Sequence, residues 1–404
     1  MKDRKDGGKK EKFPHRMWIK AAGIVLGACL CFGLGVILFV ITNRDTKIQK
    51  EENSSQAQTV EQQAVPAVKE EQKEMESDTG VKMEKAVVPE KIVKTKDSLY
   101  TYEEMKEDLN ALSEYFPDQI TVRSLGVTAD KREIPEVILG DPDSDCHLLI
   151  QASIHGREYM NTQILMCQLE DFLRNYENGI YEGMTYRDLL NGLCLHLIPM
   201  ANPDGVTISQ MGLDGIQTEE CRAFLQQCYE SDQADGVDMS EYWSSWKANA
   251  RGVDLNRNFD IGWEEFAGCE HPSSERFKGE APASEAEVQA ILQIQEEYPV
   301  KGCIAYHSSG SLVYWDYGSE GAVYEQDRLL AQMAGEVTGY ALHSTVADGT
   351  DLAGCSDYFV LQLGIPAVTI ENGTGRCPLS VEELPDLLER NQELILAYLQ
   401  LYQQ

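Results

Sequence analysis

The sequence predicts an α/β domain at residues 97–404, built on a mostly parallel β-sheet that helices cover on both faces. Two observations lead to this prediction. First, stretches such as HLLIQAS (147–153) and PAVTIE (366–371) are apolar at most positions, as strands are when both faces of a sheet are buried. Second, helix-like stretches separate these strands along the chain, which is typical of a sheet with helices on both sides.

The N-terminal end contains a predicted membrane anchor at residues 21–41. These residues carry no charge, and at about 1.5 Å per residue a helix of this length crosses about 30 Å of hydrocarbon. A cleaved signal peptide is the alternative, but its apolar part would be shorter and a small-residue cleavage site should follow it. Residues 1–20 hold eight basic residues, which predicts a cytoplasmic N-terminus and an extracytoplasmic location for everything after Thr42.

Residues 42–96 predict a disordered extracytoplasmic stalk. They are rich in Glu, Gln, Lys, Val and Ser, contain no aromatic residue and show no apolar periodicity. A flexible coil of about 50 residues has a root-mean-square span of about 40 Å. The stalk is therefore expected to hold the domain at residues 97–404 away from the membrane.

From Tyr100 onward, helix-like and strand-like stretches alternate without an internal repeat, which predicts one large domain. The predicted helices are YEEMKEDLNALSEYF (102–116), EYMNTQILMCQLEDFL (158–173), SEAEVQAILQIQEEY (284–298), RLLAQMAGEV (328–337) and a last helix near residues 381–401. The predicted strands are EVILG (136–140), HLLIQAS, LCLHLIPM (193–200), GCIAYHS (302–308) and PAVTIE.

The exported part of the chain is strongly acidic. The whole chain has a net charge of −32, and because residues 1–44 hold nine basic and three acidic residues, residues 45–404 carry −38. This charge argues against nucleic acid or another polyanion as a partner. The eleven cysteines are an odd number and cannot all pair within one chain, so the disulfide pattern stays open, as does the oligomeric state.

Ionisable residues follow three of the predicted strands. His155 and Glu158 come after HLLIQAS, His307 follows GCIAY, and Glu371 closes PAVTIE. In α/β sheets, ligands gather at the carboxyl ends of the strands, so these side chains are expected to meet. Two imidazoles and a carboxylate are a standard ligand set for catalytic zinc, with a fourth position for water. We therefore expect one zinc ion, held by His155, Glu158 and His307.

A catalytic zinc site of this kind also needs a carboxylate that does not bind the metal. Zinc lowers the pKa of its water toward about 7, and a nearby glutamate can accept the water's proton and pass it to the leaving amine. Glu371 is the candidate for this general base. His196 lies inside LCLHLIPM rather than after it, so we interpret it as a buried core histidine and not as a ligand.

These residues resemble the zinc carboxypeptidases of the carboxypeptidase A and T type, from about Tyr100 to the C-terminus. The resemblance implies an α/β/α domain around a mixed eight-stranded sheet, and hydrolysis of an amide bond by zinc-activated water. It rests on six motifs in order: HGRE (155–158), ANPDG (201–205), WKANARGVDLNRNF (246–259), FKGEAPASEAE (277–287), YHSSG (306–310) and TIE (369–371).

The same resemblance implies roles for three further residues. Asn256 and Arg257 match the pair that holds a substrate carboxylate beyond the scissile bond, a task that suits the two parallel hydrogen bonds of a guanidinium. Lys247 stands where the digestive enzymes have arginine, so the cation expected to stabilise the oxyanion is a lysine. A lysine supplies the charge but not the two parallel hydrogen bonds of a guanidinium. Residues 351–358 contain no counterpart of the substrate-capping tyrosine of the digestive enzymes.

The motifs also suggest a substrate. WKANARGVDLNRNF, SDYF and GIPAVTIENG resemble bacterial relatives that cut the γ-D-glutamyl to diaminopimelate bond of peptidoglycan stem peptides, and an extracytoplasmic domain would meet that substrate. One alternative is an extracellular carboxypeptidase that releases C-terminal L-residues from ordinary peptides. An alternative of another class is an inactive wall-binding module, which would be expected to have lost a metal ligand or the base, whereas all four positions are filled here.

Overall fold

The computed structural model describes residues 89–95, 99–349 and 352–403, which belong to a unit that runs from Glu84 to Gln404. The predicted anchor at 21–41, its basic flank at 1–20 and most of the predicted stalk lie outside the described residues. Within the described ranges, none of the helices is long and apolar enough to cross a bilayer.

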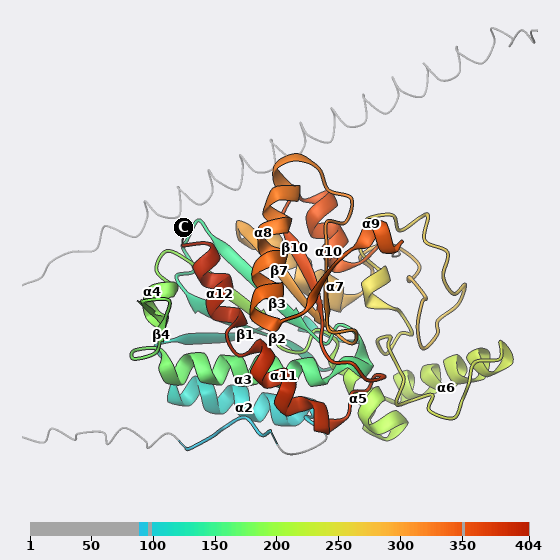
Figure 1. Cartoon of the computed structure of the whole chain (residues 1–404). Coiled ribbons are helices and arrows are strands. Elements are labelled where there is room, and N and C mark those ends of the chain that lie inside the picture. The colour runs from blue at the N-terminus through green and yellow to red at the C-terminus, as the bar shows by residue number, and fades with distance from the viewer. Residues whose placement is uncertain (1–88, 96–98, 350–351, 404) are drawn as a thin grey trace, which may run out of the picture. The chain divides into compact units, whose positions relative to one another are not determined.

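A mixed eight-stranded sheet lies at the centre of the described residues (Figure 1), in the strand order β1-β2-β6-β3-β7-β10-β8-β9. Strands β6, β3, β7 and β10 run parallel, whereas β2 is antiparallel to both of its neighbours, β1 and β6, and β8 is antiparallel to β10. The sheet is therefore parallel at its centre and mixed toward its edges. The strands are β1 (Ile120–Val127), β2 (Glu133–Gly140), β3 (His147–Ala152), β6 (Cys194–Ile198), β7 (Val300–His307), β8 (Leu312–Trp315), β9 (Ala341–Ser344) and β10 (Ala367–Glu371).

Helices cover both faces of this sheet, which confirms the three-layer arrangement (Figure 1). Side chains alternate along β3, so Leu148 and Ile150 belong to one apolar cluster and Leu149 to the other. The second cluster packs against α7 (Ala286–Glu297) and α10 (Cys355–Asp357). The first cluster packs against α2 (Tyr102–Tyr115), α3 (Met160–Asn175), α8 (Gly321–Thr338), α11 (Leu384–Asn391) and α12 (Leu394–Leu401).

The C-terminal helix differs from its prediction, because a 3-10 turn at Val381–Glu383 is followed by two helices, α11 and α12, and not by one. The chain leaves helical geometry at Glu393, with φ −99° and ψ 0°. Just before this break, the carbonyl of Asn391 accepts a hydrogen bond of 2.5 Å from the side chain of Gln168 on α3. Its side chain donates to Asn372 at 2.8 Å. Both contacts reach other parts of the domain, so sequence periodicity alone did not indicate them.

Residues 89–95, which the sequence analysis assigns to the stalk, pack along α3 with Val93 fully buried. The folded unit thus begins before the predicted boundary at residue 97. The segment runs toward the N-terminal end of α3, because residues later in the segment contact residues earlier in the helix. These contacts are Gln163 Nε2 to Lys94 O (2.6 Å), Glu170 to the N–H groups of Ile92 (2.7 Å) and Val93 (2.9 Å), and Arg174 Nη2 to Pro89 O (2.8 Å).

Candidate active site and metal centre

His155 and Glu158 meet in the loop that follows β3. His155 precedes a single 3-10 turn, η1 (Gly156–Glu158), and residues three apart in such a turn lie on the same side. Nδ1 of His155 is 2.8 Å from Oε1 of Glu158, and both residues are buried. Burial acts to raise the pKa of Glu158, but the two neighbouring histidines outweigh it and hold this pKa well below its usual range. The carboxylate is thus kept in the charged form that binds a cation.

His307 completes the group from the end of β7, the neighbour of β3 in the sheet. Its Nδ1 lies 3.1 Å from Nδ1 of His155 and 3.1 Å from Oε2 of Glu158. The ligand atoms of the three residues all lie within 4.8 Å of one another. Two imidazole nitrogens and a carboxylate that converge on one point fit zinc, with room for a fourth ligand. The structure therefore brings together the three residues predicted as ligands.

Asp254 is a functional candidate that the sequence analysis missed. Its carboxylate is fully buried, with Oδ1 3.4 Å from Nε2 of His155 and Oδ2 3.3 Å from Nζ of Lys247. A carboxylate on the outer nitrogen of a ligand histidine fixes the orientation of the ring. Burial acts to raise the pKa of Asp254, but Lys247 and His155 outweigh it and hold it well below its usual range. The sequence offered one indication of this role, because Asp254 is the first residue of the DLNRN segment that also contains Asn256 and Arg257.

Glu371 ends β10 and is paired in register with His307 on β7. Three neighbouring strands, β3, β7 and β10, therefore deliver the histidines and carboxylates to the same edge of the sheet, as predicted. Burial raises the pKa of Glu371 to about 7, with a further contribution from Glu158, while His307 and Lys247 act in the opposite direction. A bound dication would add positive charge and lower this pKa. The position suits a group that exchanges protons beside the metal.

Lys247 reaches the same region from a loop outside the sheet. The preceding Trp246 is fully buried against Tyr242 and Trp243, with ring centroids 5.7 and 5.6 Å apart. The Lys247 backbone accepts a hydrogen bond of 3.0 Å from the N–H of Gly156, inside the ligand loop. These contacts hold the ammonium group beside the metal ligands.

Asn256 and Arg257 lie in a short 3-10 turn, η3 (Leu255–Arg257), which follows Asp254. Oδ1 of Asn256 accepts a hydrogen bond of 2.9 Å from the N–H of Cys355. The guanidinium of Arg257 lies over the ring of Phe266, 5.3 Å from its centroid. Among the residues that the structure describes, none forms an ion pair with Arg257, so its charge is not committed to a carboxylate of the chain.

A second buried group, His147, Cys194 and His196, also has its ligand atoms within 4.8 Å. Here every imidazole nitrogen has a hydrogen-bond partner: His147 bonds to His196 (2.7 Å) and to the Ser144 carbonyl (2.8 Å), and His196 to Glu136 (2.6 Å). Burial raises the pKa of Cys194 to about 12, so its thiol stays protonated and is a poor metal ligand. The arrangement agrees with the interpretation of His196 as a core histidine.

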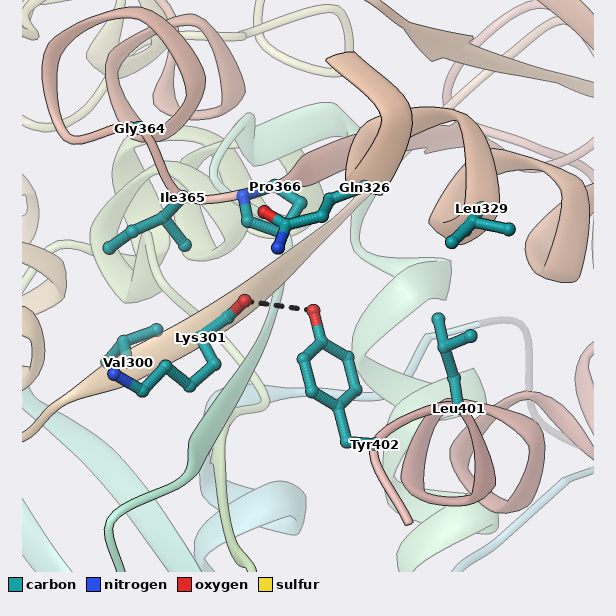
Figure 2. Close-up of a pocket in the computed structure, with 9 residues that line it drawn as sticks. All are labelled: Val300, Lys301, Gln326, Leu329, Gly364, Ile365, Pro366, Leu401 and Tyr402. Atoms are coloured by element: carbon teal, nitrogen blue, oxygen red, sulfur yellow. Dashed lines mark hydrogen bonds between the residues drawn. The ribbon is translucent and has the colours of Figure 1, made fainter. Parts of the chain in front are cut away.

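A cavity of about 490 Å³ is lined by residues other than the predicted metal ligands, and Figure 2 shows these lining residues. It opens at the amino ends of β7 and β10, whereas the histidines and Glu371 lie at the carboxyl ends. Its lining residues are Val300, Lys301, Gln326, Leu329, Gly364, Ile365, Pro366, Leu401 and Tyr402, and the Tyr402 hydroxyl donates to the Lys301 carbonyl at 2.9 Å. Among the described residues that line this cavity, none carries an imidazole or a carboxylate, so they offer none of the groups that hydrolysis requires.

A family profile described as zinc carboxypeptidase matches residues 105–376, a range that includes the three predicted metal ligands, Glu371, Lys247, Asp254, Asn256 and Arg257. The chain belongs to the zinc carboxypeptidase family. It is therefore a peptidase, a hydrolase that uses zinc, and within its described residues the group of His155, Glu158 and His307 fits that ion.

Relatives of this zinc carboxypeptidase include bacterial and animal enzymes. The gamma-D-glutamyl-L-diamino acid endopeptidase 1 of Lysinibacillus sphaericus is 28% identical over 305 residues, which cover 75% of this chain and 72% of that enzyme. Carboxypeptidase B of Astacus astacus is 24% identical over 224 residues, 55% of this chain and 65% of that enzyme.

Solved structures support the same fold. The crystal structure of thrombin-activatable fibrinolysis inhibitor superposes with a TM-score of 0.58 at 18% identity, and covers 74% of this chain and 73% of that chain. Carboxypeptidase A of Helicoverpa armigera superposes with a TM-score of 0.55 at 20% identity, and covers 76% and 75%. At this level of identity, the comparison supports the fold alone.

Proposed function

We propose that this family member is a membrane-anchored, extracytoplasmic peptidase that hydrolyses the γ-D-glutamyl to diaminopimelate bond of peptidoglycan stem peptides. The observation that carries the proposal is the similarity, over 75% of the chain, to an enzyme named for γ-D-glutamyl-L-diamino acid bonds. The residues at the carboxyl edge of the sheet supply the groups that cleavage of this amide requires.

In the proposed mechanism, His155, Glu158 and His307 hold the zinc ion. A zinc ion held there would supply Lewis acidity for the substrate carbonyl and a lowered pKa for the attacking water. Glu371, which is paired with His307 in the sheet, accepts the proton of that water and passes it to the leaving amine. Asp254, 3.4 Å from Nε2 of His155, keeps the imidazole oriented toward the metal.

Two further contacts act on the substrate. The ammonium of Lys247 faces the carbonyl oxygen on which negative charge develops, and its link of 3.3 Å to Asp254 holds it in place before the reaction begins. Asn256 and Arg257 bind a carboxylate on the diaminopimelate side of the scissile bond, through the paired hydrogen bonds that a guanidinium can form.

A substrate comparison tests the proposal. Purified protein is incubated with muropeptides and, separately, with a library of ordinary peptides, and the new ends are identified by mass spectrometry. We expect stem peptides to be cut between D-glutamate and diaminopimelate. If the protein instead releases single C-terminal L-residues from ordinary peptides and leaves muropeptides intact, it is an ordinary carboxypeptidase. The zinc ligands, the base Glu371 and the carboxylate-binding pair Asn256 and Arg257 would then keep their roles. Failure to cut either substrate would indicate an inactive module.

Replacing Arg257 by lysine should lower kcat/KM by about tenfold or more, although the charge is retained, because an ammonium cannot form the paired hydrogen bonds. The loss should depend on the carboxylate that Arg257 binds. Amidation of that carboxylate should slow the wild type and cost the lysine variant much less. Arg251→Lys, an exposed arginine of the same loop, is the matched control and should stay near wild type. A kcat/KM within twofold of wild type for Arg257→Lys would exclude a role for Arg257 in binding the substrate carboxylate.

The proposed location makes a separate prediction. Protease added to intact, wall-stripped cells should remove the catalytic domain and spare a cytoplasmic control protein, because the basic residues before the anchor at 21–41 keep only the N-terminus inside. Loss of the domain is followed with an antibody against its C-terminal helices. Complete protection would contradict the proposed topology without affecting the assignment of the metal and the base.

A further inference from the structure

The ANPDG motif forms a turn between the two loops that build the site. It follows β6 and starts α5 (Pro203–Met211), with Asn202 at the position before the helix. On one side lies the loop of the metal ligand His155, and on the other the loop that carries Lys247. Asn202 is fully buried and has no contact with the metal ligands among its hydrogen bonds.

The carboxamide of Asn202 bonds to both loops. Its Nδ2 donates to the carbonyl of Ile154, directly before His155, at 3.0 Å, and to the carbonyl of Ala248, directly after Lys247, at 3.1 Å. Its Oδ1 accepts from the N–H of Gly205 at 2.8 Å. Both amide hydrogens are therefore used, one on each side of the site.

Glycines allow the three segments to touch through their backbones. A Cβ on Gly156 would lie 2.3 Å from the carbonyl oxygen of Gly205, and a Cβ on Gly205 would lie 2.4 Å from that of Ala248. The turn therefore fits between the two loops without space for even a methyl group. A displacement of one segment must move the next.

The two loops depend on Asn202 in different ways. Backbone hydrogen bonds already tie the His155 loop to the turn, from Ala201 N–H to Ala152 O (2.8 Å) and from Asn202 N–H to Ser153 O (3.1 Å). The Lys247 loop, by contrast, is tied to the turn through the side chain of Asn202. The Lys247 loop also keeps its backbone bond to the His155 loop, from Gly156 N–H to Lys247 O (3.0 Å), so a change of the Asn202 side chain should shift the Lys247 loop rather than free it.

We propose that Asn202 is a positioning residue that sets the place of the Lys247 ammonium relative to the metal ligands. The proposal rests on the function assigned above to Lys247 and adds the group that locates it. Misplacement of a charge by about 1 Å can cost about 10²-fold in rate, so a buried carboxamide can control catalysis without touching the substrate.

The test uses the full chain, loaded with zinc, and whichever of the two substrates the wild type cuts. Asn202→Asp keeps the shape but places a carboxylate against two carbonyl oxygens. We expect kcat to fall by about 10- to 100-fold with KM within about threefold, because ground-state binding is untouched. Zinc affinity, measured by competition with a chelator, should stay within about threefold of wild type. Asn110→Asp, an exposed asparagine on α2, adds the same charge and should change nothing.

A double-mutant cycle with Lys247→Met decides whether Asn202 acts through Lys247. In that background, Asn202→Asp should cost less than about threefold more in kcat. An equal loss in both backgrounds would overturn the proposal, and so would zinc affinity weakened by about 30-fold or more, which would place the effect on the His155 loop. If Lys247→Met alone leaves kcat unchanged, the role of Lys247 is wrong and the proposal fails with it, while the substrate assignment stands. Asn202→Ser serves the same tests if the aspartate variant does not fold.

Discussion

Glu371→Gln should keep its zinc and lose about 10²- to 10⁴-fold in kcat. The amide has nearly the same shape as the carboxylate but cannot accept a proton from the attacking water. The residue ends β10 in register with His307, so its loss should remove proton transfer without disturbing the sheet. Steady-state kinetics together with zinc analysis on the same preparations measure the effect.

The control for this variant is Glu389→Gln, an exposed glutamate on α11, which should behave as wild type. A kcat for Glu371→Gln within about threefold of wild type would mean that another group accepts the proton. Loss of zinc from the variant would instead place Glu371 among the metal ligands, and the assignment of His155, Glu158 and His307 would need revision.

The double variant His155→Ala with His307→Ala should bind almost no zinc, while the wild type binds about one ion per chain. Removing both imidazoles leaves Glu158 as the remaining protein ligand of the predicted three, which is too few to retain the ion. Elemental analysis after dialysis against a weak chelator measures the stoichiometry, and activity should disappear in parallel.

His271→Ala is the matched control for the loss of an imidazole. This residue lies at the surface, 2.9 Å from Asp235, and its replacement should leave the zinc content unchanged. Stoichiometric and tight zinc in the double variant would show that the ion binds elsewhere. The buried group of His147, Cys194 and His196 would then be the first place to examine.

The convergence of His155, Glu158 and His307 could be predicted from the sequence because these residues follow or end apolar runs. In parallel strands such runs share an edge of the sheet, and β3, β7 and β10 prove to be direct neighbours. His155 and Glu158 could be paired because their spacing is local. The same reasoning placed Glu371 at that edge, but its pairing with His307 depends on the order of the strands, which apolar runs did not predict.

Asp254 could not be found in this way. Its partners, His155 and Lys247, sit on different loops, and the contacts form only when these loops fold against each other. Strands β1, β8 and β9 were missed for a related reason. They lie toward or at the edges of the sheet, and their burial is partial, so they lack the continuous apolar pattern that marks the central strands.

Because residues 89–95 pack along α3, their contacts determine which part of the domain would first resist a force applied at Pro89. Because the segment runs toward the start of the helix, Pro89 lies near the C-terminal end of α3, by Arg174. Glu158, one of the predicted metal ligands, lies just before the opposite end of α3. A force applied at Pro89 is therefore borne first by Arg174 and by the paired backbone contacts of Glu170, which lies about three helical turns from Glu158. Contacts at the C-terminal end of α3 would therefore take up such a force before it reached the loop of His155 and Glu158 at the other end.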